Sequence, residues 1–174
     1  RYAYDNQAQV LPWNMAKLAS ALLALMPDPD AAIEPFTQAV HAMPDLIAQE
    51  WLTVFAAKIG IATPQAEDKA LIDDLLALMQ AGGSDFTNTF RGLSEDTARD
   101  QFVDREAFDT WSSKWEMRLE SEDKPTDLMR SVNPSVIPRN HRIEAMIAAA
   151  VQENYAPFQT LKEALATPYD APTV

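Results

Sequence analysis

Cysteine is absent from the 174-residue sequence, and histidine and glycine are rare. Without a thiol, the chain cannot use a cysteine nucleophile or form a cysteine zinc site, and His41 and His141 are too few for a three-histidine metal centre. The glycines at 60, 82, 83 and 92 do not form the closely spaced pattern that lets backbone amides approach a phosphate. These absences exclude thiol catalysis, such metal centres and a glycine-rich nucleotide loop.

Positive charge and long apolar runs are also scarce. Fourteen Lys and Arg stand against 26 Asp and Glu, and the resulting net charge of -12 repels nucleic acid and anionic lipid. The longest uninterrupted apolar stretch is the seven residues 145–151, whereas a membrane-spanning helix needs about 20. We therefore expect neither nucleic acid nor a membrane among the partners of this chain.

Apolar residues are nevertheless plentiful enough for a core, because they make up 47% of the sequence. Alanine and leucine dominate, and apolar residues recur at three- and four-residue intervals rather than in the alternation typical of strands. The pattern predicts an all-α fold of roughly eight helices in an irregular multi-helix arrangement. We expect residues 1–174 to form a single helical domain and, because the sequence begins with Arg1 rather than Met, to be part of a longer protein.

Prolines set the expected boundaries of the first helices. Pro12 suits the first turn of a helix and is predicted to open the first one. A second helix is predicted over residues 31–41, where Pro35 is tolerable only in the first turn, so that His41 lies near a helix end. Pro44 is predicted to begin a third helix, which ends at Gly60, where a left-handed cap is needed.

The remaining helices are predicted from caps and apolar periodicity. The expected elements are a helix from the cap Thr63-Pro64 to Gly82-Gly83, a short helix capped by Ser84 or Asp85 and ending near Gly92, a longer helix from about Asp104, a loop over 120–125, and helices over 143–151 and 155–166.

Three carboxylates at four-residue spacing are the first candidate for chemistry. A continuous helix would align Asp96, Asp100 and Asp104, which could then hold a hard cation such as Mg²⁺. The alternative is a solvated acidic face, which is favoured because the whole chain is acidic and no glycine turn lies nearby. Asp73-Asp74 and Glu67-Asp68 receive the same interpretation, so no metal ligand is assigned.

An aromatic stripe is the second candidate. Phe108, Trp111, Trp115 and Leu119 recur at helical spacing and could form a stacking platform for a nucleic-acid base. The spacing is equally that of a buried helical face, and the chain has no basic groove to guide a nucleic-acid strand. Core packing is therefore the preferred interpretation.

The segment 124–142 is the one basic region, with a local charge of +3. The guanidinium groups of this segment could bind an anion or another protein surface. Alternatively, they could pair with carboxylates of this chain and fix an irregular loop. We favour the second interpretation and predict that at least one of Arg130, Arg139 and Arg142 forms such a pair. The charged residues of the segment are Lys124, Arg130, Arg139 and Arg142, which flank His141, and the single acid Asp127.

Several motifs, in order and spacing, resemble the C-terminal portion of the selenoprotein O family across nearly the whole chain. They are Arg1-Tyr2-Ala3-Tyr4, Asn6-Gln7, Trp13-Asn14, Thr89-Phe90-Arg91, Trp115, Arg118-Leu119, residues 129–134, Arg139-Asn140 and Pro168-Tyr169-Asp170. The chain departs from the family in having Ala8 where proline is common, which affects local turn geometry. It also lacks the terminal cysteine or selenocysteine of many members, so redox control through a C-terminal thiol is not open to it.

The resemblance implies a pseudokinase-like parent protein that transfers AMP from ATP to Ser, Thr or Tyr hydroxyls of proteins, with magnesium. The family's nucleotide-binding, general-base and metal-holding residues all precede the segment that corresponds to residues 1–4. The resemblance therefore places no catalytic, cofactor-binding or metal-binding residue in this chain, and we expect the chain alone to be inactive.

The implied partners are the N-terminal catalytic region of the same protein and the protein substrates of the parent. Bacterial-type members lack the terminal residue, and the resemblance to them implies a bacterial cytoplasmic location. The rival hypothesis is a free-standing, non-enzymatic helical interaction module, which would use residues 124–142 or an exposed aromatic stripe to hold its partner.

Overall fold

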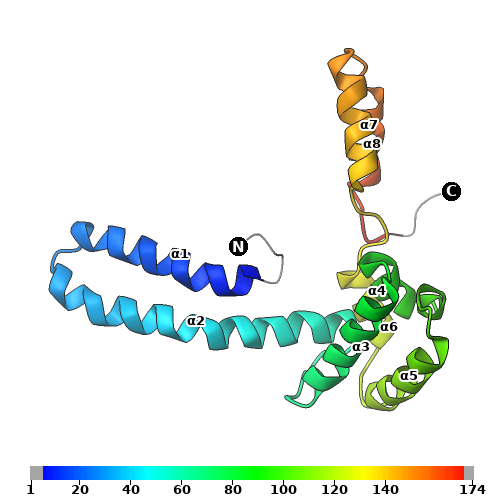
Figure 1. Ribbon diagram of the computed structural model, residues 1–174, viewed down its shortest axis with the longest axis horizontal. Helices are drawn as coiled ribbons and strands as arrows, with labels where there is room; N and C mark the ends of the chain where they lie inside the picture. The colour runs from blue at the N-terminus through cyan, green and yellow to red at the C-terminus, as the bar shows by residue number, and fades with distance from the viewer. Residues whose placement is uncertain (1–5, 171–174) are drawn as a thin grey trace. The chain divides into compact units, whose positions relative to one another are not determined.

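The computed structural model describes residues 6–170, and within them every regular element is helical (Figure 1). The prediction of an all-α fold is confirmed. The motif at residues 1–4 lies outside the described residues. The helices are α1 (Gln7–Leu22), α2 (Pro29–Lys58), α3 (Asp68–Gly82), α4 (Phe86–Leu93), α5 (Arg105–Leu119), α6 (Pro125–Val132), α7 (Asn140–Val151) and α8 (Ala156–Ala164), with short 3₁₀ turns at Leu23–Leu25 and Ala98–Gln101.

The chain divides into two compact units, residues 1–52 and residues 53–174. The first contains α1 and most of α2, and the second contains the end of α2 and the six following helices. The single domain expected over residues 1–174 stays a prediction.

The prolines of the first two helices lie inside them, so the predicted boundaries there are wrong. Pro12 lies inside α1, which begins at Gln7, and Ala8 occupies the first turn, where a proline would also be tolerated. A single helix, α2, replaces the two predicted ones and contains both Pro35 and Pro44. Each proline removes one backbone hydrogen bond but does not end the helix, because the residues around it are strong helix formers.

Gly60 ends α2 as predicted. Its φ of +87° lies in the left-handed region, and the backbone N–H groups of Gly60 and Ile61 donate to the carbonyls of Ala57 and Ala56, at 3.0 and 2.9 Å. This pair of bonds is the Schellman arrangement that satisfies the last carbonyls of a helix. Glycine is also required for space, since a Cβ at position 60 would lie 2.9 Å from the Cβ of Pro125.

Helix α3 begins at Asp68, later than the predicted start at Pro64. The Asp68 carboxylate accepts a hydrogen bond from the backbone N–H of Gln65 at 2.8 Å, which holds the preceding residues in a turn. The predicted C-terminal end is confirmed, because Gly83 adopts a φ of +65° directly after the helix. The later start leaves the carbonyl of Thr63 free to accept a hydrogen bond from Arg118, at 3.3 Å.

The aromatic stripe of α5 forms the core of the second unit, as predicted. Phe108, Trp111 and Trp115 are buried, and the two indole rings stack with centroids 5.5 Å apart and planes inclined by 13°. Their N–H groups donate to backbone carbonyls, Trp111 to Leu71 at 2.9 Å and Trp115 to Ile59 at 2.7 Å. The other large buried apolar residues of this unit are Ile59, Ile61, Ile72, Leu75, Met79, Phe90, Leu93, Phe102 and Met129.

Helices α7 and α8 form a hairpin whose two helices pack against each other (Figure 1). Neither helix contains a buried residue. The chain entering the hairpin is tied to the chain leaving it, because the backbone N–H groups of Ser135 and Val136 both donate to the carbonyl of Pro168, at 2.7 and 3.2 Å.

Candidate functional site

Arg139, in the basic segment, forms a two-pronged ion pair with Asp85. Its Nη1 and Nη2 atoms lie 2.6 and 3.1 Å from the two carboxylate oxygens. Asp85 is at the same time the cap of α4, because it accepts a hydrogen bond from the backbone N–H of Asn88 at 2.8 Å. The predicted pairing of at least one arginine of this segment with a carboxylate of the chain is confirmed. The expectation that the segment is an irregular loop is wrong, because residues 125–132 form α6, which the short apolar pattern of this segment did not reveal.

Arg91 is the central residue of the cluster that the basic segment forms with α4. The side chain is nearly buried, and its Nε donates to Glu95, one turn further along, at 2.6 Å. Its Nη1 donates to the backbone carbonyls of Asn133 and Tyr169, at 3.2 and 3.0 Å. Arg91 therefore joins α4 to both chain segments that flank the α7–α8 hairpin, which explains why three of the motifs lie together in space.

Asn133 extends this cluster to the end of α2. It is 1% exposed, and its Nδ2 donates to the carbonyl of Lys58 at 2.8 Å while its Oδ1 accepts from Lys58 Nζ at 3.3 Å. The ammonium group of Lys58 also lies 5.8 and 5.6 Å from the ring centroids of Phe86 and Phe90. Burial lowers the pKa of Lys58 from its usual value, since a low-dielectric surrounding disfavours the charged form.

The other basic residues of segment 124–142 divide into two groups. Arg130 donates to the carbonyl of Ser94 at 3.2 Å, so it too reaches the end of α4. Lys124, His141 and Arg142 are exposed at the surface. His41, which was predicted near a helix end, instead lies exposed inside α2, because that helix continues through Pro44.

Arg118 organises a second polar cluster, between α5 and the start of α3. Its Nε and Nη2 lie 2.7 and 3.1 Å from the two oxygens of Asp68, and its Nη1 lies 2.8 Å from Glu122. Hydrogen bonds to Ser121 and to the carbonyl of Thr63 use the remaining donors, so all five N–H groups of the guanidinium are satisfied. The bond to Asp68 is the main cause of a raised pKa at Arg118.

Asp68 itself corrects one prediction, because this carboxylate is buried, at 4% exposure, and does not belong to a solvated face. The neighbouring acids do conform to the prediction: Asp73 and Asp74 are exposed and pair with Lys69 and Lys114. Sequence spacing could not distinguish them, since burial of Asp68 depends on Arg118, fifty residues away in the chain.

The three carboxylates at four-residue spacing do not share a helix. Asp96 lies in a turn with a φ of 57°, Asp100 lies in a 3₁₀ turn and pairs with Arg105 at 3.0 Å, and Asp104 caps α5. Over residues 6–170, no group of three or more His, Cys, Asp or Glu side chains is placed to hold a metal ion. Within the same residues, no helix has the length and apolar character needed to cross a bilayer.

Chemically, these clusters fix positions. The carboxylates of Asp85, Asp68 and Glu95 each face a guanidinium, and Asn133 is engaged through both side-chain atoms. Within the second unit, the cluster around Arg91 sets where α4, α6 and the base of the α7–α8 hairpin lie relative to one another, and the cluster around Arg118 ties α5 to the start of α3.

The ion pair between Asp85 and Arg139 predicts a pH dependence of stability. The hydrogen bond from Arg139 lowers the pKa of the Asp85 carboxyl, so the stabilisation is present above the unfolded-state value of about 4 and is lost as the pH falls through the folded-state value. The Asp85 side chain is 34% exposed, so solvent weakens the ion pair. We therefore expect the pair to contribute about 1 kcal/mol or less to the free energy of unfolding.

The substitution Asp85→Asn isolates this charge, because asparagine caps a helix as well as aspartate does. Between about pH 6 and about pH 3, we expect urea unfolding to show a smaller loss of stability in the variant than in the unmodified chain. Equal losses in the two proteins would show that the pair contributes nothing measurable.

The chain is similar along its length to a set of longer proteins. A family model described as Protein adenylyltransferase SelO matches residues 1–166. Proteins named Protein nucleotidyltransferase YdiU from Roseobacter denitrificans and from a Ruegeria species are 54% and 53% identical to it, and one from Clostridium botulinum is 44% identical. Each match covers 97% or 98% of this chain but 36% of the relative, so the chain spans about a third of the length of these relatives.

Proposed function

Because the chain belongs to the SelO family of nucleotidyltransferases, we propose that it is the helical C-terminal region of a protein adenylyltransferase. The observation that carries the proposal is the match over residues 1–166, combined with the 36% share of the relatives' length that the chain spans. The remaining length gives room for a catalytic region elsewhere in the same protein. A free-standing interaction module is less well supported, since the matched relatives are longer nucleotidyltransferases.

The proposed reaction of the whole protein joins AMP to a protein hydroxyl. The oxygen of a Ser, Thr or Tyr side chain bonds to the α-phosphorus of ATP, the bond to the β-phosphate oxygen breaks, and pyrophosphate and the hydroxyl proton leave. Such transfer depends on cations and metal ligands positioned around the phosphates. The resemblance implies that the nucleotide-binding and metal-holding residues of the family precede the segment that corresponds to residues 1–4. The proposal therefore includes the binding of ATP and magnesium by the rest of the protein.

The proposed role of this chain is to support that catalytic region. The polar clusters around Arg91 and Arg118 hold the helices of the second unit in fixed positions, which gives a rigid body against which another part of the protein can pack. The proposal includes protein substrates as partners. It also includes a bacterial cytoplasmic location, which the bacterial origin of the matched relatives supports.

Transfer of labelled nucleotide by the full-length protein tests this function. With magnesium and ATP labelled at the α-phosphate, we expect label to become fixed to the protein itself or to a generic protein acceptor. ATP labelled at the γ-phosphate is the matched control and should leave the acceptor unlabelled, because pyrophosphate departs. Incorporation of the γ-label would indicate a kinase, and incorporation of neither label would contradict nucleotidyl transfer.

A further inference from the structure

The unit formed by α1 and the first part of α2 has almost no core of its own. Ala32 is the only buried residue among residues 6–52. Large apolar side chains along both helices and in the turn between them are instead exposed, and they are Val10, Leu11, Trp13, Met15, Leu18, Leu22, Leu25, Ile33 and Leu46. Burial of such side chains is the main force that holds helices together. A helical pair with this exposure therefore requires a further apolar layer to cover it.

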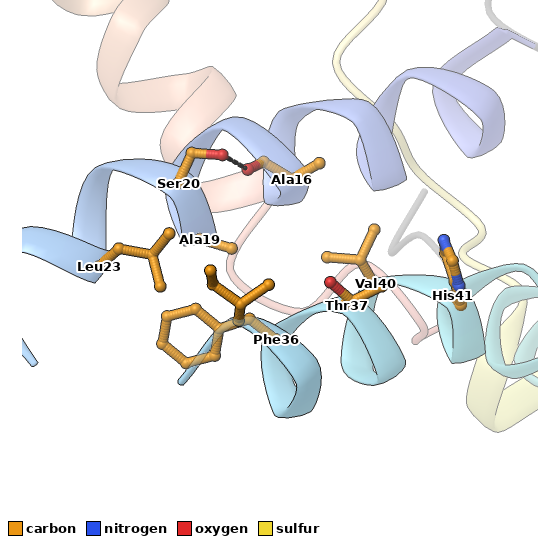
Figure 2. Close-up of a pocket in the computed structure, with 9 residues that line it drawn as sticks. Ala16, Ala19, Ser20, Leu23, Phe36, Thr37, Val40 and His41 are labelled. Carbon is orange, nitrogen blue, oxygen red and sulfur yellow. Dashed lines mark hydrogen bonds between the residues drawn. The ribbon is translucent and has the colours of Figure 1, made fainter. Parts of the chain in front are cut away.

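The seam between the two helices is open on two sides, and the two sides differ in chemistry. One hollow, shown in Figure 2, includes the polar side chains of Ser20, Thr37 and His41. The other hollow, of about 350 Å³, is lined entirely by apolar residues, and we call it the methionine groove. Its lining residues are Met15, Leu18, Ala19 and Leu22 from α1 and Phe36, Ala39, Val40 and Met43 from α2. Ala19, Phe36 and Val40 line both hollows and so form the seam itself.

This difference indicates which side is covered. The polar hollow is lined in part by side chains that form hydrogen bonds with water. Covering this hollow with an apolar surface would bury His41 or Thr37 without a hydrogen-bond partner, which is unfavourable. No side chain that lines the methionine groove has a hydrogen-bonding group that burial would leave without a partner. The flexible side chains of Met15 on α1 and Met43 on α2 can adapt to the shape of a helix that packs there. An apolar partner therefore gains most by packing on the methionine groove, with the polar hollow left facing solvent.

We propose that the methionine groove is the docking site for an apolar helical face from the rest of the same polypeptide. The inference rests on the proposed function, because the chain spans 36% of the relatives' length and the occupant lies in the remainder. A covalently attached segment binds with a high effective concentration, which favours it over a second copy or a separate protein. Since no charged residue lines the groove, the matching face carries no charge at its centre.

Chemical labelling of the full-length protein tests this docking. The 174 residues contain no cysteine, so a cysteine introduced by Leu18→Cys or Thr37→Cys is identified without ambiguity in the digested protein. Both positions are exposed within this unit, Leu18 at 48%, so without an occupant both should react rapidly. We expect maleimide to modify the Leu18→Cys protein at least about tenfold more slowly than the Thr37→Cys protein, each relative to its denatured rate.

Three outcomes would overturn the proposal. Rapid reaction at both positions would mean that nothing covers the groove, and slow reaction at both would mean that the methionine groove is not the preferred side. Protection at position 18 that disappears on dilution would identify a second copy as the occupant. A second substitution in the groove, Leu22→Cys, should repeat the result if the first variant folds poorly.

Oxidation of the unmodified full-length protein gives a test without mutation. Met15 is 37% exposed in this unit and Met117, on α5, is 64% exposed, so exposure alone accounts for about a twofold difference in oxidation rate. With the groove covered, dilute peroxide should oxidise Met15 at least about tenfold more slowly than Met117, whereas a difference of about twofold or less would contradict docking. Labelled-AMP transfer, measured on the same samples, separates the two proposals. Protection without transfer would refute the proposed function and leave the docking in place, and transfer without protection would do the reverse.

Discussion

Replacing Trp115 with alanine is expected to lower the free energy of unfolding by about 3–5 kcal/mol, as removal of a large buried aromatic side chain does. The indole is 8% exposed and stacks on Trp111, so the substitution leaves a cavity that α5 and its neighbours can fill only in part. It also removes the donor to the carbonyl of Ile59, in the Schellman turn that ends α2. Urea unfolding followed by far-ultraviolet circular dichroism measures the loss.

Met117→Ala is the matched control, since this residue lies on the same helix and is 64% exposed. We expect its effect to stay within about 0.5 kcal/mol. A Trp115→Ala protein as stable as the Met117→Ala protein would contradict the assignment of the aromatic stripe to the core.

Replacing Arg118 with methionine is expected to cost a similar amount, about 3–5 kcal/mol, for an electrostatic reason. Methionine keeps the length and apolar stem of arginine but leaves the carboxylate of Asp68 buried, at 4% exposure, without its guanidinium. Glu122, whose side chain is 9% exposed, loses its arginine as well. A buried carboxylate without a cation is strongly unfavourable, so the folded state should lose stability.

Two further variants separate this effect from a general loss of surface charge. Lys114→Met removes a cation whose side chain is 59% exposed and which lies 3.9 Å from Asp74, and it should change stability by less than about 1 kcal/mol. The double substitution Arg118→Met with Asp68→Leu should recover part of the loss, because it removes the more buried of the two carboxylates left without the guanidinium. A single Arg118→Met substitution as mild as Lys114→Met would refute the cluster as a structural element.

The helical class and most helix ends could be predicted because they depend on local patterns. Apolar spacing predicted the buried face of α5, and the caps at Asp85 and Asp104 were recognisable from short polar residues ahead of apolar runs. The prolines led to wrong boundaries in the first two helices. Inside α2, the free-energy cost of losing one backbone hydrogen bond at each proline is smaller than the cost of ending the helix among strong helix formers. Pro35 or Pro44 considered alone does not reveal which of the two costs is larger.

The polar clusters could be predicted only in outline. The excess positive charge of residues 124–142 in an acidic chain indicated an arginine pair, and Arg139 forms one. The central roles of Arg91 and Asn133, and the contact of Asn133 with Lys58, depend on segments at least 42 residues apart in the chain. Charge counts and spacing do not contain that information, because only the tertiary fold brings these segments together.

Titration of the 174-residue chain with magnesium and ATP in a calorimeter tests the central claim most directly. The claim is the proposal that this chain supports a nucleotidyltransferase whose nucleotide site lies elsewhere in the protein, as the family resemblance implies and as the lack of a closely spaced glycine pattern favours. We expect no heat of binding at nucleotide concentrations up to about 1 mM from a sample whose circular dichroism is helical, and clear binding by the full-length protein. Binding of ATP by the 174-residue chain with a dissociation constant of about 1 µM, lost on substitution of Asp96, Asp100 or Arg139 by alanine, would contradict the claim.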